Sequence, residues 1–133
     1  MSARPPAGGR RLSRSAEFER VYRQGRSIAN RHLVLYTFPN PSTGRPRLGL
    51  SVSRKVGGAV ERNRVKRLLR EAWARAEDEL VAGQDVVVVA RPQARELAER
   101  GGLAGVDAAL SELIDRARLR AGESGAPAEE PES

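Results

Sequence analysis

Residues 57–76, GGAVERNRVKRLLREAWARA, place the strongest constraint on how this chain folds. On a helix of 3.6 residues per turn, the apolar side chains of this stretch, together with Leu80 beyond it, share one side. These side chains are Val65, Leu68, Leu69, Ala72, Trp73 and Ala76. The opposite side carries Asn63, Lys66, Arg67 and Arg70, with Arg64 and Arg75 at its edge. The pattern predicts a helix that buries one stripe and exposes a cationic strip.

The charge of this strip is not balanced locally. Only Glu61 and Glu71 lie within it, whereas a solvated helix mixes signs to stabilise itself. Residues 1–76 hold 18 bases and 4 acids, and residues 77–133 hold 6 bases and 13 acids. A solvent-exposed helix without a partner is the alternative interpretation. Because crowded like charges cost stability, the pattern favours a helix that binds a polyanion such as RNA or DNA.

Hydrophobic periodicity predicts one domain over residues 12–120 between two disordered ends. These ends are a basic arm rich in Pro and Gly, residues 1–11, and an acidic tail, residues 121–133. The expected elements are a helix from Ser13 or Ser15 to about Gln24, strands 31–38 and 47–53, the central helix to about Val81, strand 85–90, a short helix 93–100 broken at Gly101 and Gly102, and a last helix of about 106–119. The order αβββαβα, with the first of the early β pieces split or extended, predicts an α+β two-layer sandwich with one small sheet.

Alternation along the strands predicts which side chains share a face. In residues 31–38, one face carries His32, Val34, Tyr36 and Phe38. In residues 47–53, Leu48, Leu50 and Val52 lie on one face, and Gly49, Ser51 and Ser53 lie on the other. A Gly and Ser face beside Tyr36 is polar and uncrowded, so it either accepts a ligand or faces solvent. The β-branched run 85–90 predicts an interior strand covered on both faces.

Residue types that carry catalysis are scarce in this chain. It has no cysteine, and His32, its only histidine, is better explained as a strand residue than as an acid or base. The basic half holds too few carboxylates for a two-metal nuclease, and no phosphate-binding glycine motif is present. No apolar run is long enough to span a membrane, and the N-terminus lacks the apolar centre of a signal peptide. We therefore expect a cytoplasmic nucleic-acid binder with no catalytic residue, metal site or small-molecule substrate of its own.

Five segments of the chain, taken in order, resemble the bacterial ribonuclease P protein subunit. They are FERVY (18–22), SIANR (27–31), LVLY (33–36), LGLSVSRKVG (48–57) and RNRVKRLLRE (62–71). The similarity runs from about Leu12 to Arg91 and fades beyond it, and Gly58 stands where the family often has Asn. The resemblance implies a protein that binds a large catalytic RNA and helps it remove the 5′ leader of precursor tRNA. The RNA supplies the chemistry and requires Mg²⁺, and the protein itself needs no cofactor.

The resemblance also implies details of the fold and roles for particular residues. The fold would be similar to the second domain of ribosomal protein S5, with a mixed sheet and a left-handed β-α-β crossover, against the usual right-handed rule. The residues implied to face the RNA subunit are Arg62, Asn63, Arg64, Lys66, Arg67 and Arg70. The residues implied to contact the leader, in a cleft between the first helix and the sheet, are Phe18, Tyr22 and Tyr36, with Ser51 and Ser53 as neighbours.

Two other functions are compatible with the sequence. A ribosomal protein would share the basic charge and the small α+β build, but it would not need three aromatic rings to converge. A free-standing ribonuclease would cut RNA without an RNA subunit. For the rings themselves, and for Phe18 above all, a place in the core is the alternative to a place in a binding site.

Overall fold

A computed structural model describes residue 12 and residues 15–121 of the chain. Its elements, in chain order, are α2 (Ser15–Gln24), β1 (Arg26–Ala29), β2 (Leu33–Pro39), β3 (Arg47–Ser51), α3 (Ala59–Ala76), the 3₁₀ helix η1 (Glu77–Glu79), β4 (Gln84–Ala90) and α4 (Ala94–Arg116). This order confirms the predicted αβββαβα arrangement. The predicted disordered arm, residues 1–11, and all but the first residue of the predicted tail lie outside the described residues.

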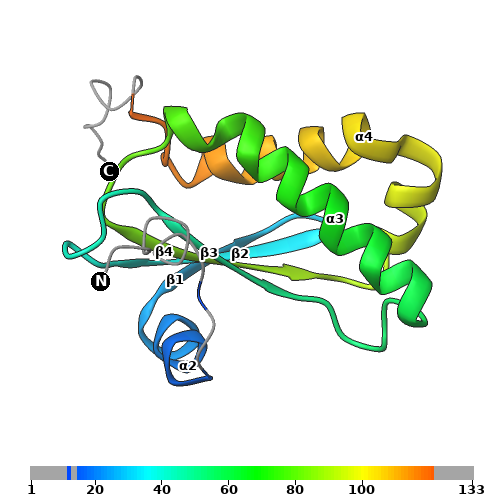
Figure 1. Ribbon diagram of the computed structural model, residues 1–133, viewed down its shortest axis with the longest axis horizontal. Coiled ribbons are helices and arrows are strands. Elements are labelled where there is room, and N and C mark those ends of the chain that lie inside the picture. The colour runs from blue at the N-terminus through cyan, green and yellow to red at the C-terminus, as the bar shows by residue number, and fades with distance from the viewer. Residues whose placement is uncertain (1–11, 13–14, 122–133) are drawn as a thin grey trace, which may run out of the picture.

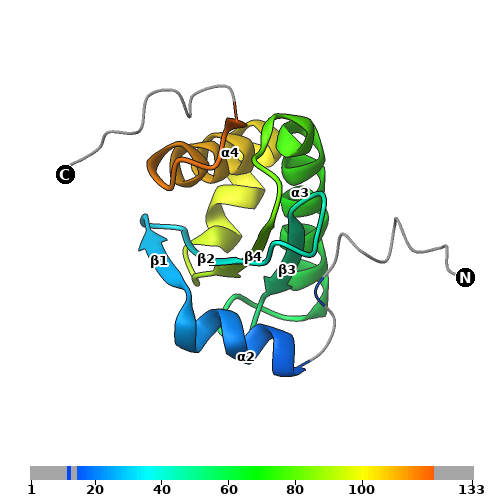
Figure 2. The same cartoon turned by 90° about the vertical axis from the view of Figure 1, so that its left-hand side faces the viewer.

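The four strands form one mixed sheet in the order β1-β2-β4-β3. Strand β4 runs antiparallel to β2 and parallel to β3. Figures 1 and 2 show α3 and α4 together on one face of the sheet and α2 on the other face. The α+β class and the small mixed sheet are therefore confirmed, with α2 packed on the face that α3 and α4 leave uncovered.

The parallel pair β3 and β4 is joined through α3 by a left-handed crossover. Viewed along the two strands from start to end, as in Figure 2, the chain leaves β3 on the right, returns through α3 above the sheet and enters β4 on the left. This path turns counter-clockwise as it advances, which is the hand opposite to the usual β-α-β connection. The handedness implied by the family resemblance is therefore present.

The main core lies between the sheet and the pair α3 and α4. The predicted apolar stripe of α3 is buried along its length, and Leu80 is buried beyond it. Strand β2 alternates as predicted, with Leu33, Leu35 and Thr37 buried. In β4, Val86 and Val88 join this core, whereas Val87 joins a smaller apolar cluster under α2. An interior strand with apolar side chains on both faces therefore explains why helices cover both faces of the sheet.

The end of α3 differs from the prediction, and the predicted break in the last helical segment is present. Helix α3 ends at Ala76, before the predicted end near Val81, because residues 77–79 tighten into a 3₁₀ turn and Leu80 is extended. The two predicted helices of residues 93–119 lie in α4, which is broken by a kink at Gly102, inside the predicted break. Gly102 has φ 57° and ψ −150°, a conformation that only glycine adopts readily. The predicted break is therefore present as a kink and not as a loop.

Candidate nucleic-acid interface

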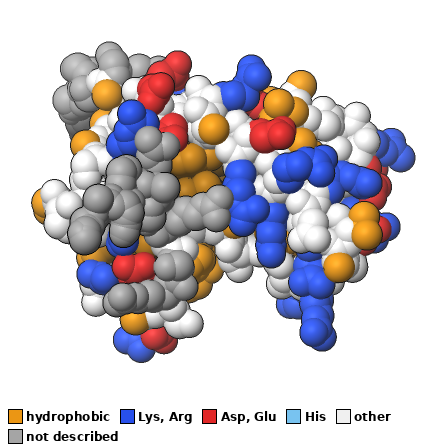
Figure 3. All heavy atoms as spheres, viewed as in Figure 1, with side chains coloured by type: hydrophobic (Ala, Val, Ile, Leu, Met, Phe, Trp, Pro, Cys, Tyr) orange, Lys and Arg blue, Asp and Glu red, His pale blue; other side chains and the backbone are white. Residues whose placement is uncertain are grey.

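The exposed side of α3 carries the predicted cationic strip, which we define as Arg62, Asn63, Lys66, Arg67 and Arg70. Figure 3 shows basic side chains gathered along α3. Asn63, Arg67 and Arg70 are exposed, and Arg62 and Lys66 are half-buried at the edge of the strip. In the described part of the chain, no acidic side chain pairs with Lys66, Arg67 or Arg70, and the buried Nε of Arg62 has no acceptor. The strip is therefore available to an external anion.

Arg64 is placed differently from the rest of the predicted RNA-contacting residues, because it faces α4. Its guanidinium lies 3.8 Å from Glu99, and Arg75 lies 3.7 Å from Asp107, also on α4. Arg95 of α4 links the two helices further through Glu61 of α3 at 3.8 Å, and it also pairs with Glu99 on its own helix at 3.2 Å. Acidic side chains of α4 therefore border the strip on the side of Arg64 and Arg75.

The start of α3 is completed by Glu61. Gly58 is the N-cap residue and offers no side chain, but its N–H donates to Glu61 Oε1 at 2.9 Å. The pKa of Glu61 is lowered, mainly by a hydrogen bond from its own backbone N–H, with further contributions from Arg95, the Gly58 amide and Arg64. The carboxylate therefore stays ionised and satisfies donors at the helix start. Gly58, which has no side chain to cap the helix, therefore keeps only the half of the capping box that Glu61 supplies.

On the opposite face of the sheet, Phe18, Tyr22 and Tyr36 come together as an aromatic group. The ring centroids of Phe18 and Tyr22, one helical turn apart, are separated by 6.4 Å. The rings of Tyr22 and Tyr36 meet edge to face at 4.9 Å. The Phe18 ring lies directly over Gly49, where an added Cβ would fall 2.6 Å from Phe18 Cζ. Glycine at this strand position therefore leaves the space that the ring occupies.

The aromatic group is partly core and partly surface. Phe18 and Tyr36 are half-buried against a small cluster of Leu12, Val21 and Val87, and Tyr22 is 38% exposed. The rings of Phe18 and Tyr36 are therefore partly in the core, as the alternative interpretation states, and they also keep an accessible surface.

The two predicted serines differ in their placement. Ser51 is half-buried and pairs with Val89, two rows beyond the row of Tyr36, Val87 and Gly49. Ser53 is exposed past the end of β3, and its Oγ accepts a hydrogen bond from the Lys55 N–H at 3.2 Å. Ser51 therefore lies on the strand face that Phe18 covers at Gly49, whereas Ser53 lies beyond the end of the strand.

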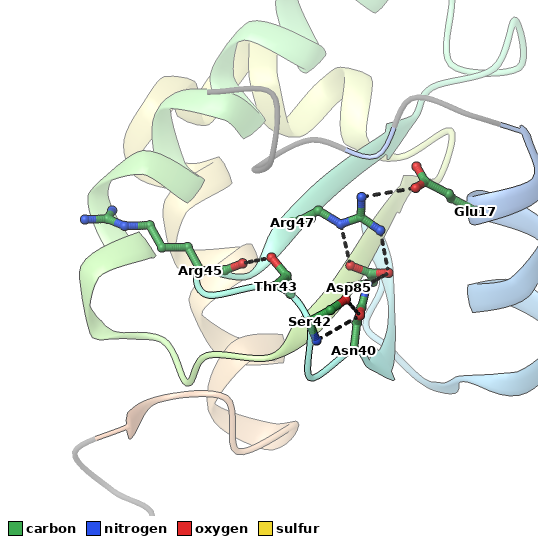
Figure 4. A network of polar contacts seen from close by, with 7 residues as sticks. All are labelled: Glu17, Asn40, Ser42, Thr43, Arg45, Arg47 and Asp85. Carbon is green, nitrogen blue, oxygen red and sulfur yellow. Dashed lines mark hydrogen bonds and ion pairs between the residues drawn. The ribbon is translucent and has the colours of Figure 1, made fainter. Parts of the chain in front are cut away.

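Sequence reasoning missed a buried polar network next to the aromatic group, shown in Figure 4. Asp85, only 1% exposed, accepts from Arg47 Nε at 2.8 Å and Nη2 at 3.0 Å, and from Asn40 Nδ2 at 3.1 Å. The remaining Arg47 Nη1 donates to Glu17 of α2 at 3.1 Å. The hydrogen bond to Asp85 raises the pKa of Arg47, despite its partial burial. The sequence signal for this network was Asp85, an acidic residue at the start of the β-branched run 85–90.

The described residues were also searched for metal-binding groups and for membrane-spanning helices. They contain no group of three or more His, Cys, Asp or Glu side chains that is placed to hold a metal ion. Among the helices of this part of the chain, none combines the length and apolarity needed to cross a membrane.

The sequence and the fold were compared with those of known proteins. The family model described as Ribonuclease P matches residues 7–117. The ribonuclease P protein component of Shouchella clausii is 42% identical over 111 residues, which cover 84% of this chain and 88% of the relative.

Solved structures of ribonuclease P proteins share the fold. A Staphylococcus aureus ribonuclease P protein, described as a mutant with defective mRNA degradation activity, matches with a TM-score of 0.77 and 33% identity over 84% of this chain and 91% of that chain. The ribonuclease P protein of Thermotoga maritima matches with a TM-score of 0.72 and 33% identity, covering 80% of this chain and 96% of that chain. Sequence, fold and element order agree, and the chain therefore belongs to the ribonuclease P protein family.

Proposed function

We propose that this protein serves ribonuclease P through two surfaces on opposite sides of its sheet, the cationic strip for the RNA subunit and the aromatic group for the 5′ leader of precursor tRNA. As the protein component of ribonuclease P, the chain is a subunit of an endoribonuclease ribonucleoprotein that processes tRNA. Its partner is the ribonuclease P RNA. The observation that carries the proposal is the separation of the two surfaces, with α3 on one face and α2 on the other.

The cationic strip suits a structured RNA. Its guanidinium and ammonium groups neutralise phosphates without reading sequence, and they lie on a helix whose other side is anchored in the core. A rigid helix presents these charges at fixed spacing, so they match a folded RNA surface. The acidic side chains of α4 leave one side open for this contact.

The aromatic group suits an unpaired strand. Aromatic faces stack on single-stranded bases with little demand on sequence, which fits leaders that vary among precursors. Tyr22 is exposed and Tyr36 is half-buried, so both rings keep surface that a base can reach. A ribosomal protein would not need these three rings to come together. Family membership does not favour the ribosomal alternative either. A cytoplasmic location, where precursors and the RNA subunit would meet the protein, is part of the proposal.

We expect the strip to bind the RNA subunit chiefly through charge. If about five phosphates are neutralised, log K should fall against log salt concentration with a slope of roughly −3 to −5. In the variant with Arg67→Ala and Arg70→Ala, each lost phosphate contact should make the slope shallower by about 0.7 to 0.9. Both residues are exposed, so the fold should be unchanged. If the folded double variant kept the wild-type slope of log K against log salt concentration, the RNA contact would lie elsewhere. The matched charge control is a double variant of Arg100 and Arg116 on α4.

We expect the purified protein to leave RNA uncut by itself and to restore cleavage of precursor tRNA at low Mg²⁺ when it is mixed with a bacterial ribonuclease P RNA. We assign the Mg²⁺ requirement to that RNA. Because a Staphylococcus aureus ribonuclease P protein mutant is described as having defective mRNA degradation activity, breakdown of mRNA by the protein alone is the second candidate function. The assay should therefore include an mRNA beside precursor tRNA. Cutting of either RNA by nuclease-free protein would show that the chain carries chemistry of its own.

A further inference from the structure

Helix α2 depends on tertiary contacts for its position. It has 10 residues, and an isolated helix of this length is not stable in water. Among the described residues, it is the one helix on its face of the sheet (Figure 2). Its buried residue, Val21, packs with Leu12 and Val87. Apolar contacts of this kind are non-directional, so they do not by themselves set the rotation of the helix.

The network of Figure 4 supplies a directional contact at the first turn of α2. Two hydrogen bonds to Asp85 fix the guanidinium plane of Arg47 against β4. The third group, Nη1, therefore points in a fixed direction, and Glu17 of α2 accepts from it at 3.1 Å. The side chains of Arg47 and Glu17 are only 16% and 19% exposed. Ion pairs of this fork geometry are specific in orientation as well as favourable in energy.

The last turn of α2 is held by a close approach to β2. A Cβ at Gly25, directly after the helix, would lie 2.4 Å from the carbonyl oxygen of Thr37. The backbone of the helix end therefore contacts the strand that carries Tyr36. Between these two points lie Phe18, next in sequence to Glu17, and Tyr22, one turn later. Both ends of α2 are thus fixed relative to the Tyr36 ring.

We propose that Glu17, Arg47 and Asp85 are positioning residues for leader binding. Through the Glu17 contact they set the rotation of α2, so that Phe18 and Tyr22 face Tyr36 and present one stacking surface. The inference rests on the leader-binding role proposed above for the aromatic group. It differs from a role in stability alone, because it requires that loosening the first turn of α2 weakens binding of the leader specifically.

The test compares Glu17→Ala with Glu19→Ala. Glu19 lies on the same helix, and its ion pair with Arg23 at 3.5 Å is largely exposed, so the two variants remove the same charge but only one breaks the network.

In hydrogen exchange of the full-length protein, Glu17→Ala should speed exchange of α2 amides and leave β4 unchanged. In reconstituted holoenzyme it should bind precursor tRNA about five- to tenfold more weakly than Glu19→Ala, with equal affinity for mature tRNA. Glu17→Gln, whose amide oxygen still accepts from Arg47, should recover most of the loss.

Each other outcome overturns the inference in an identifiable way. Unchanged exchange of α2 in Glu17→Ala would show that the network does not hold the helix. Faster exchange with precursor affinity equal to that of Glu19→Ala, or an equal loss for both RNAs, would remove the positioning role. Tyr36→Ala in the same assay separates the two proposals. If it too leaves precursor affinity unchanged, the leader-binding role itself fails.

Discussion

Replacing Arg47 with leucine is expected to lower the free energy of unfolding by about 3–5 kcal/mol. The substitution leaves the Asp85 carboxylate in a site that is only 1% exposed, with Asn40 as its one remaining hydrogen-bond donor among the described residues. A buried charge without its partner is one of the largest single penalties in a folded protein, because desolvation is no longer offset. The Glu17 contact to α2 is lost at the same time.

Urea denaturation followed by circular dichroism measures this change. Arg45→Leu is the matched control, since Arg45 lies two residues earlier and its ion pair with Asp78 at 3.0 Å is exposed, with side chains 51% and 83% accessible. Such a surface pair is worth about 0–1 kcal/mol. A double variant, Arg47→Leu with Asp85→Leu, should recover much of the stability because no unpaired charge remains. An Arg47→Leu effect no larger than that of Arg45→Leu would show that the network adds little to the fold.

Replacing Tyr36 with alanine is expected to weaken binding of precursor tRNA to the holoenzyme selectively. One stacked base is worth about 1–3 kcal/mol, which corresponds to a loss of roughly five- to 150-fold in affinity. Mature tRNA, which has no leader, should bind as it does to the wild type. Tyr36 also supports Tyr22 through the edge-to-face contact at 4.9 Å, so its loss also removes a support of the Tyr22 ring.

The measurement is the ratio of the two affinities in reconstituted holoenzyme. Phe38→Ala is the matched control, because Phe38 lies on the same face of β2 and is also half-buried, but its ring packs under Arg20, 5.8 Å from the ring centroid, and not against Tyr22. Loss of affinity for both RNAs, or a fall in melting temperature much greater than that of Phe38→Ala, would assign Tyr36 to the core and not to leader binding.

Local patterns in the sequence were sufficient to predict most of the fold. The apolar stripe of α3, the alternation of β2 and the interior character of β4 depend on periodicity within one element, which one stretch of chain carries by itself. The left-handed crossover and the roles of the aromatic rings came from family resemblance, because no pattern within one element encodes them. The cationic strip was also predictable, since its residues share one side of a single helix.

Only the tertiary structure decided which side chains meet across elements. The pairing of Arg47 with Asp85 depends on the parallel register of β3 and β4, and that register places residues far apart in sequence directly opposite each other. Arg64 faces Glu99 because α4 packs beside α3, and its partner could not be read from the helix alone. The contact between Tyr22 and Tyr36 likewise requires α2 to lie across the sheet. Periodicity states which side of an element is apolar, but ion pairs and ring contacts depend on long-range packing, which no local pattern encodes.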